Sequence, residues 1–283
     1  MDCQEEMACV KTGTMVPYKD LYIYEILGEV SGVRSIFRED FIGCWNEEGG
    51  SFLFFSSPHD QEVNAFIQKN GMKLVAREVL DYKSWQAGEE LKAFKVGNLL
   101  ICPPWEDCTA KRGELLIHLD PCVVFGTGYH PTTRSCLEAL WKVYQGETPQ
   151  VVLDLGTGSG ILALAAAKWG AERVVAVDCN ELAVDTALRN VSANQEAGRI
   201  EVQLGRAEDL IEEEADLVCA NLHSQVIEAL LEKPGLFRKR WVILSGVFQR
   251  EADEVEKALN QKGVQIHERI PREKWATLLF KND

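Results

Sequence analysis

Short apolar runs typical of β-strands fill the first part of this chain. Each run alternates or clusters β-forming side chains and is bounded by polar residues or glycine. The four predicted strands are LYIYEIL, FIGCWN, SFLFFS and MKLVAREVL. A fifth stretch, HDQEVNAFIQKNG, has helical spacing and ends at Gly71, a residue typical of the position after a helix. We therefore expect residues 1–78 to form a small α+β domain.

The hydrophobic pattern becomes regular from residue 113 onward, where strand-like and helix-like segments alternate. Strands are expected at 114–119, 150–155, 173–178 and 200–204, in ADLVCAN up to 221, in RWVILSG up to 246, and at the closing VQIHERI and WATLLF. Helices are expected near 132–145 and at 160–169, 181–195, 223–233 and 250–262. Such alternation predicts an α/β domain with a parallel sheet over residues 113–283.

The closing strands and the stretch between the two domains complete this organisation. VQIHERI and WATLLF leave no room for a crossover helix, so they must pair antiparallel inside an otherwise parallel sheet. Residues 79–112 hold a short amphipathic stretch, the strand-like VGNLLI and a Pro-Pro stop, and we expect an ordered linker there. Two unequal domains also agree with the length of 283 residues.

A glycine-rich turn after the strand at 150–155 carries the clearest chemical signal in the sequence. Gly156, Gly158 and Gly160 allow a positive φ and let a ligand approach where a Cβ would collide. Asp178 ends the next strand, where a carboxylate can accept hydrogen bonds from both hydroxyls of a ribose. Strand, turn, helix and acid in this order predict a site for a nucleoside-bearing ligand. The competing interpretation is a tight turn with surface acids.

Two residues around the turn indicate which class of nucleoside-bearing cofactor the site would bind. Ile161 stands where a dinucleotide fingerprint needs its third glycine, so pyrophosphate binding is disfavoured. Asp154 adds a second carboxylate, which suits a cationic ligand better than an anionic one. S-adenosylmethionine has both a sulfonium and an ammonium, and it is the cofactor that we expect.

Asn221, at the carboxyl end of its strand, is the predicted catalytic residue. A neutral amide there can accept hydrogen bonds from an amine and direct the nitrogen lone pair at a methyl carbon. The sulfonium is already an activated leaving group, so positioning and deprotonation of the amine are the main tasks, and no metal is required.

Four more side chains near these motifs have two interpretations each. His223 is a candidate general base, but a solvent-facing histidine at a helix start is favoured. His130 precedes a proline and is expected to shape a turn rather than transfer protons. Trp105 is expected to anchor the linker rather than cover the cofactor. Glu208 is either an acid beside the adenine or a solvated loop acid, and neither is preferred.

Charge restricts the partners. A net charge of −14 and a pI near 4.9 oppose binding to a phosphate backbone, because nucleic-acid proteins need clustered basic residues. A basic polypeptide would be a better partner, although acidity also serves solubility alone.

Cysteines and termini bear on the compartment. The nine cysteines form no CxxC pair and are odd in number, so we expect reduced core thiols rather than a zinc site or a disulfide framework. The N-terminus has acids where a signal peptide has a basic region, and no apolar run is long enough to span a membrane. We expect a cytoplasmic, monomeric protein that contacts neither membranes nor nucleic acid.

Five segments together resemble the ribosomal protein L-eleven methyltransferase family. They are FGTGYHPTT at 125–133, LDLGTGSGILA at 153–163, VAVDCN at 175–180, CAN at 219–221 and the linker LKAFKVGNLLICPPWE at 91–106. The resemblance covers about residues 80–283, and the first domain matches only in size and position. It implies a class I, Rossmann-like methyltransferase fold with a mostly parallel seven-stranded sheet.

The resemblance also implies roles for individual residues. Thr133 would touch the methionine part of the cofactor, and Gly156 and Gly158 would line the turn. Asp154 would lie near the cofactor's amino group, and Asp178 would bind the ribose. By the same resemblance, Asn221 would lie beside the methyl group and the incoming amine. Residues 1–78 would capture a ribosomal protein and swing about the linker.

Two positions depart from the family. Cys122 and Tyr129 replace smaller residues, and Tyr129 is a candidate to narrow the acceptor entrance or to stack on a substrate. The sequence after Asn221 lacks an NPPY-type motif, which argues against methylation of glutamine or DNA bases.

The function that we predict is S-adenosylmethionine-dependent N-methylation of lysine side chains or an α-amine of a large-subunit ribosomal protein. A second hypothesis keeps the enzyme class and changes the acceptor to another protein or a small amine. A third is a non-catalytic cofactor-binding protein. A fourth is a nucleotide-dependent oxidoreductase, against which Ile161 and Asp154 argue.

Overall fold

A seven-stranded sheet organises the C-terminal part of the molecule, in a computed structural model that describes residues 19–37, 40–47, 49–82 and 91–282. In spatial order its strands are β10 (Ile200–Leu204), β9 (Arg173–Asp178), β8 (Val151–Leu155), β11 (Leu217–Asn221), β12 (Trp241–Phe248), β14 (Trp275–Lys281) and β13 (Ile266–Arg272). Neighbours from β10 to β12 are parallel, and β14 is antiparallel to both β12 and β13. The predicted mixed sheet is confirmed.

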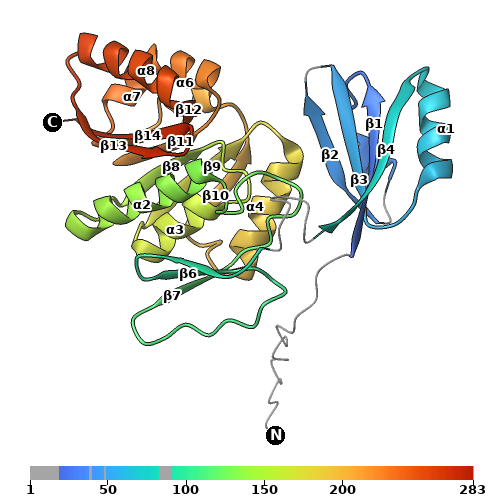
Figure 1. Cartoon of the computed structure of the whole chain (residues 1–283), viewed down its shortest axis with the longest axis horizontal. Coiled ribbons are helices and arrows are strands. Elements are labelled where there is room, and N and C mark those ends of the chain that lie inside the picture. Colours follow the sequence, from blue (N-terminus) through green and yellow to red (C-terminus); the bar gives the residue numbers. More distant parts are fainter. Residues whose placement is uncertain (1–18, 38–39, 48, 83–90, 283) are drawn as a thin grey trace, which may run out of the picture.

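Helices cover both faces of this sheet (Figure 1). One face packs against α2 (Pro131–Gly146), α3 (Ile161–Trp169) and α4 (Glu181–Ala193). The other face packs against α5 (Ala207–Leu210), α6 (Ser224–Leu231), α7 (Pro234–Phe237) and α8 (Gln249–Gln261). Successive residues of β8, Val152 and Leu153, belong to the two different clusters, as the alternation of a strand requires. Strand β8 is therefore buried on both faces, which explains its continuous apolar sequence.

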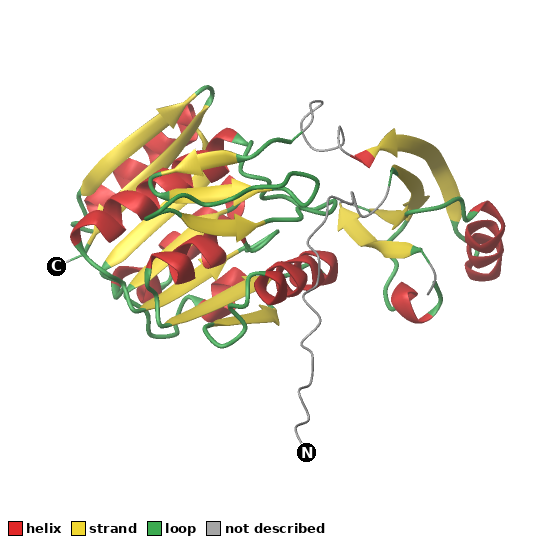
Figure 2. Ribbon diagram, turned by 90° about the horizontal axis from the view of Figure 1, so that it is seen from below, coloured by secondary structure: helices red, strands yellow, loops and turns green. Residues whose placement is uncertain are grey.

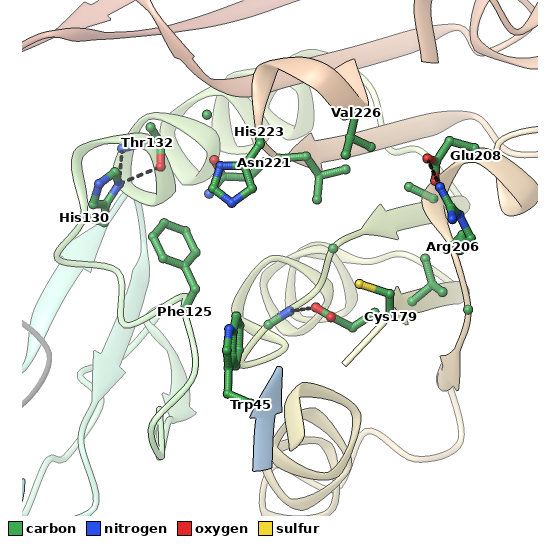
Figure 3. Close-up of a pocket in the computed structure, with 18 of the residues that line it drawn as sticks. Trp45, Phe125, His130, Thr132, Cys179, Arg206, Glu208, Asn221, His223 and Val226 are labelled. Atoms are coloured by element: carbon green, nitrogen blue, oxygen red, sulfur yellow. Dashed lines mark hydrogen bonds and ion pairs between the residues drawn. The ribbon is translucent and has the colours of Figure 1, made fainter. Parts of the chain in front are cut away.

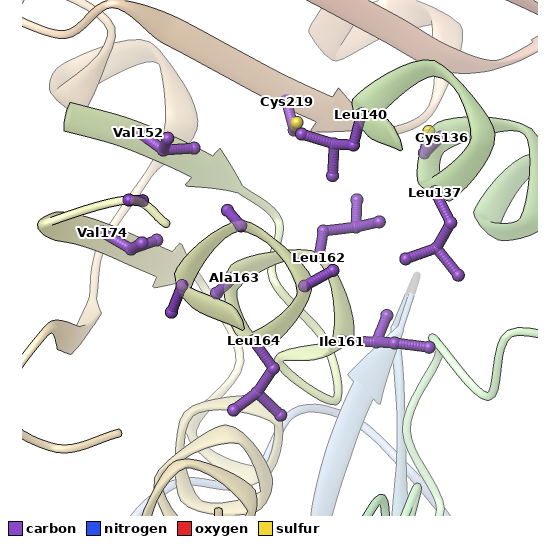
Figure 4. Packing of buried hydrophobic residues seen from close by; sticks show 14 of the residues in the cluster. Cys136, Leu137, Leu140, Val152, Ile161, Leu162, Ala163, Leu164, Val174 and Cys219 are labelled. Carbon is purple, nitrogen blue, oxygen red and sulfur yellow. The ribbon is translucent and has the colours of Figure 1, made fainter. Parts of the chain in front are cut away.

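Helix α3 lies deep in the first of these layers (Figure 4). Ile161 to Ala167 are all buried, and four of these seven positions are alanine. Small side chains let the helix approach the sheet closely, while Ile161 and Leu162 fill the space toward α2. The helix that begins at the glycine turn is thus fixed by packing, and it fixes the turn in its place.

A second, smaller sheet forms the N-terminal part, which we call the N-terminal module and define as the described residues between 19 and 82. Its strands are antiparallel in the order β2 (Phe41–Glu47), β3 (Gly50–Phe55), β1 (Asp20–Leu27) and β4 (Lys73–Asp81). Helix α1 (Asp60–Asn70) covers one face, beside the short 3₁₀ helix η1 (Val33–Ser35), and Gly71 ends α1 in a left-handed conformation. The predicted strands and helix are confirmed, and β4 continues three residues past the expected boundary at 78.

A third sheet corrects one prediction about topology. The strand expected at 114–119 forms as β7 (Leu115–His118), but it pairs with β6 (Leu99–Cys102), which pairs with β5 (Phe94–Val96), and not with the seven-stranded sheet. Its buried side chains, with those of β6, pack into the cluster of α2 and α3. Residues 91–112 of the expected linker are therefore integrated into the C-terminal part, where Figure 1 labels β6 and β7 and Figure 2 shows the same part from below. Residues 79–82 belong to the N-terminal module, and residues 83–90 lie outside the described residues.

The cysteines correct a second prediction. Cys102 and Cys108 are joined by a disulfide, whereas only reduced thiols were expected. The two prolines after Cys102 begin a turn in which Glu106 N donates to the Pro103 oxygen over 3.1 Å, and this turn brings the two Cα atoms within 6.2 Å. Spacing along the sequence does not reveal such a turn. The remaining described cysteines are free, and Cys122, Cys136 and Cys219 are buried as expected, while Cys3 and Cys9 lie outside the described residues.

The described residues contain neither a candidate membrane-spanning helix nor a cluster of metal-ligating side chains. None of its helices combines the length and apolar character that crossing a bilayer requires. No group of three His, Cys, Asp or Glu side chains lies close enough there to hold a metal ion.

Candidate active site

A cavity of about 580 Å³ opens at the carboxyl ends of the parallel strands. It lies where β8 separates β9 and β10, which follow it on one side, from β11 and β12 on the opposite side. At such a switch in strand order the connecting loops diverge and leave a crevice, which is where open α/β sheets bind ligands. Five of the predicted site residues line the cavity: Gly156, Gly158, Asp178, Glu208 and Asn221.

The glycine turn forms one wall of the cavity. Gly158 has a φ of 54°, and a Cβ there would lie 2.4 Å from the Phe125 carbonyl oxygen. The same oxygen accepts a hydrogen bond from Ser159 N over 2.9 Å. A Cβ on Gly156 would lie 2.2 Å from a methyl of Leu222. The glycines therefore make room for neighbouring parts of the protein as well as for a ligand.

Asp178 lies beside the glycine turn, at the end of β9, as expected from the sequence. Its carboxylate accepts hydrogen bonds from Gly158 N and Asn180 N, each over 3.0 Å. Burial raises the pKa of Asp178 above its ordinary value, and these backbone donors oppose that shift. The two bonds fix the orientation of the carboxylate and leave further lone pairs for hydroxyl donors.

Asp154 is buried behind the turn, with 1% of its surface exposed, and does not line the open cavity. Oδ2 accepts a hydrogen bond from Thr157 Oγ1 over 2.7 Å and one from Ala163 N in the first turn of α3 over 3.1 Å. Oδ1 has no hydrogen-bond partner among the described residues. Burial raises the pKa of Asp154 to about 6, although both hydrogen bonds lower it.

In Asn221, as in Asp154, one side-chain polar atom has a hydrogen-bond partner and the other has none among the described residues. Its Nδ2 donates to Thr133 Oγ1 over 3.4 Å, while its buried Oδ1 has no partner among the described residues. Thr133 is buried in the first turn of α2, and its neighbour Thr132 lines the cavity instead. Buried acceptors are normally paired, so the unpaired oxygens of Asp154 and Asn221 fit a ligand that carries N–H donors and positive charge.

Glu208 lies in the wall, with 17% of its side chain exposed. It forms an ion pair with Arg206 over 2.8 Å, and the hydrogen bond from Arg206 lowers the pKa of Glu208. Glu208 is therefore an ion-paired residue of the cavity wall and not a freely solvated loop acid, and its place beside an adenine stays a prediction.

An aromatic wall on the opposite side was not predicted. Phe125 and His130 line the cavity (Figure 3), with ring centroids 5.0 Å apart. Trp275 lines it as well, and its ring centroid lies 5.2 Å from that of His130. Phe248 stacks on Trp275 at 4.4 Å. Phe125 and His130 belong to the motif at 125–133, but Trp275 has no local signal, because the β13–β14 pairing carries it to the site from the far end of the sequence.

Two histidine predictions are confirmed. His130 is the N-cap of α2, its Nδ1 lies 2.8 Å from Thr132 Oγ1, and burial lowers its pKa. His223 is exposed and precedes α6, and it also borders the cavity.

Of the two aromatic residues near the linker, Trp105 follows its prediction and Tyr129 does not. Trp105 Nε1 donates to the Leu91 oxygen over 2.7 Å, so it anchors the linker. The Tyr129 hydroxyl accepts from Lys92 N over 2.7 Å and donates to Lys92 O over 2.9 Å. Tyr129 therefore holds the linker and does not line this cavity, so the structure gives no support to a place at the acceptor entrance.

The strand order, the reversed strand β14, and a cavity with a glycine turn and a carboxylate at the switch point define a class I methyltransferase fold. Comparison with known proteins identifies the family. Residues 57–283 match the family model described as "Ribosomal protein L11 methyltransferase (PrmA)", and the chain belongs to this family.

Individual relatives and a solved structure agree with this assignment. The ribosomal protein L11 methyltransferase of Halalkalibacterium halodurans is 39% identical over 199 residues, which cover 68% of this chain and 61% of that protein. Its counterpart in Clostridium perfringens is 32% identical over 269 residues, which cover 93% of this chain and 83% of that protein. The crystal structure of ribosomal protein L11 methylase from Lactobacillus delbrueckii subsp. bulgaricus covers 68% of this chain and all of that one, with 28% identity and a TM-score of 0.59.

Proposed function

We propose that this protein transfers methyl groups from S-adenosylmethionine to lysine side chains or an α-amine of a large-subunit ribosomal protein. The family and the named relatives support the reaction and the acceptor class. The observation that carries the proposal is the pair of buried acceptors without partners among the described residues, Asp154 Oδ1 and Asn221 Oδ1, beside a cavity with a ribose-type carboxylate.

The residues present fit the cofactor in chemistry. Asp178 would hold the ribose hydroxyls, Asp154 the ammonium, and Glu208 the adenine. Gly156 and Gly158 leave the backbone accessible at the turn. Thr133, which accepts the hydrogen bond of Asn221 Nδ2, would lie on the methionine side. When bound, the cofactor supplies an electrophilic methyl group on a sulfonium.

Asn221 is the group that we assign to positioning the acceptor. Its Nδ2 is engaged with Thr133, so its Oδ1 is the atom free to accept a hydrogen bond from an incoming amine. An amine held by that bond has its lone pair directed by the protein and not by random encounter, which lowers the entropic part of the barrier.

The aromatic wall suits the proton balance of this reaction. An alkylammonium must lose a proton before its nitrogen can act as a nucleophile, and an apolar environment disfavours the charged form. Phe125 and Trp275 supply such an environment, and burial lowers the pKa of the neighbouring His130, which disfavours a charged imidazolium there. Desolvation of the amine would therefore promote the release of its proton to solvent without a dedicated general base. The neutral nitrogen then forms the new bond to the methyl carbon, while the sulfonium leaves as the thioether S-adenosylhomocysteine and solvent takes up the second proton.

The acceptor's identity is tested by incubating the purified chain with methyl-labelled S-adenosylmethionine and a purified large-subunit ribosomal protein. We expect label in that protein, and none with Asp178→Ala, which removes the ribose acceptor. Absence of label with the unchanged protein, while calorimetry shows that it binds the cofactor, would remove the ribosomal acceptor.

A small amine or another protein is the second candidate acceptor, because the aromatic wall would accept many alkyl amines. Labelling a cell extract and separating proteins from metabolites distinguishes these acceptors.

A further inference from the structure

The N-terminal module contributes a side chain to the cavity. Trp45 of β2 lines it together with Gly158, Asp178 and Cys179. In Figure 3 Trp45 lies across the cavity from Asn221 and His223. We propose that Trp45 completes the nucleoside side of the cofactor pocket, so that docking of the N-terminal module and cofactor binding stabilise each other. This inference rests on the proposed function, because it takes S-adenosylmethionine as the ligand.

The sheet of the N-terminal module is apolar on both faces, so it can pack against the C-terminal part as well as against its own helix. Tyr24, Ile26 and Phe55 face α1 in the module's own core. The opposite face buries four residues against the C-terminal part: Leu21, Ile23, Ile42 and Phe54. Two apolar faces on one sheet require two coverings, and the second covering is the C-terminal part.

The surface that receives the module is made of the same segments that form the pocket. It consists of Cys122, Val123 and Val124 and of Leu182 and Ala183 in the first turn of α4. The segment 122–124 leads into Phe125, whose oxygen holds the glycine turn through Ser159 N. Helix α4 begins at Glu181, directly after the loop of Asp178 and Cys179. The segments that contact the N-terminal module are therefore continuous with those that form the wall of the pocket.

The module approaches α4 closely beside Trp45. A Cβ on Gly43 would lie 2.4 Å from Leu182 Cδ1, so glycine lets β2 press against α4 at this point. An ion pair between Arg34 and Asp185 joins the module to α4 farther along. These contacts place the indole of Trp45 at the pocket edge, where an aromatic face can cover a nucleoside.

Coupling between the two events follows from linkage. A ligand that touches the docked module binds the docked state more tightly, and it must stabilise docking by the same factor. Disturbing the docked interface should then weaken cofactor binding even at a residue that does not line the pocket.

The first test is calorimetry of S-adenosylmethionine binding to the full chain. We expect Trp45→Ala to raise Kd about tenfold, as for loss of one aromatic stacking partner. Trp45→Phe should keep most of the affinity. Ile42→Asp, which places a charge in the docking face outside the pocket, should also raise Kd several-fold. Val75→Asp places the same charge at an exposed position of the same sheet and should leave Kd unchanged.

A second readout needs no substitution. Adding S-adenosylmethionine to the unchanged protein should slow amide hydrogen exchange in β2 at 41–47 and in the segment 122–124. Equal Kd values for the unchanged protein and Trp45→Ala, or unaltered exchange in β2 on saturation, would overturn the inference. A higher acceptor KM with unchanged cofactor Kd would assign Trp45 to the acceptor and overturn it as well. Failure of the unchanged protein to bind the cofactor would instead reject the proposed function.

Discussion

At the scale of single residues, the charge of Asp154 should govern cofactor affinity. Its pKa of about 6 means that the carboxyl is neutral below this pH and ionised above it. Only the ionised form attracts an ammonium, so Kd for S-adenosylmethionine should fall as the pH rises through about 6. Calorimetry on both sides of this pH measures the change.

Asp154→Asn is the matched variant for this prediction. Its amide oxygen can still accept the hydrogen bonds of Thr157 Oγ1 and Ala163 N, so the start of α3 keeps its support. We expect weaker binding at neutral pH, by about tenfold for the loss of one charge-assisted contact, and a flat pH response. A variant that retains the full pH dependence would show that another group titrates.

Substitutions of Asn221 and Thr133, also at the scale of single residues, should distinguish an effect on catalysis from an effect on cofactor binding. Asn221→Ala removes the unpaired Oδ1, and we expect kcat to fall by about a hundredfold while cofactor Kd changes little. Thr133→Val removes only the acceptor of a long 3.4 Å hydrogen bond, so its effect on kcat should be a few-fold. Single-turnover kinetics with saturating cofactor measure both, and equal effects of the two variants would contradict an acceptor role for Asn221.

At the scale of elements, the glycine turn is limited by backbone space. Gly158→Ala adds a Cβ that meets the Phe125 oxygen at 2.4 Å and requires an unfavourable positive φ. The conformational part alone costs about 1–2 kcal/mol, so we expect a lower free energy of unfolding and loss of cofactor binding. Gly146→Ala is the control, because nothing lies within 4 Å of its Cβ and alanine favours the end of α2. Denaturant titration gives the free energy of unfolding of both variants. Equal values would contradict the steric limit that the Phe125 oxygen places on the glycine turn.

The elements also show what local sequence determines. Strands β8 and β9 begin and end within one residue of the expected bounds, because burial on both faces requires an unbroken apolar run. The position of β7 was missed because its apolar face can pair with more than one sheet, and only contacts distant in sequence decide between them. The same holds for the short helices α5 and α7, which have too few residues to show a period.

Site residues divide in the same way. Gly156, Gly158, Asp178 and Asn221 lie at or just after strand ends, so their convergence at one edge of the sheet follows from the topology that the alternation predicts. Trp45 and Trp275 come from the first sheet and the last hairpin, and no local pattern links them to the turn. The cofactor side of the site was therefore predictable, whereas the walls supplied by tertiary packing were not.

At the scale of the whole molecule, the net charge of −14 should act on the encounter with a basic acceptor. Attraction between opposite net charges extends over about 30 Å at 0.01 M salt and about 10 Å at 0.1 M. Raising the salt concentration should therefore increase KM for a ribosomal protein acceptor by several-fold, mainly through slower association. Cofactor Kd should change far less, because its contacts lie in a cavity close to buried groups that salt screens poorly.

A short peptide with one lysine and a net charge near zero is the matched acceptor for this experiment. Its KM should be higher at all salt concentrations and nearly independent of salt, because it lacks the long-range attraction but reaches the same aromatic wall. Steady-state methylation of both acceptors over a series of salt concentrations makes the comparison. If both acceptors showed the same salt dependence, the effect would lie in the protein itself or its cofactor site, and the acidic surface would serve solubility and not recognition.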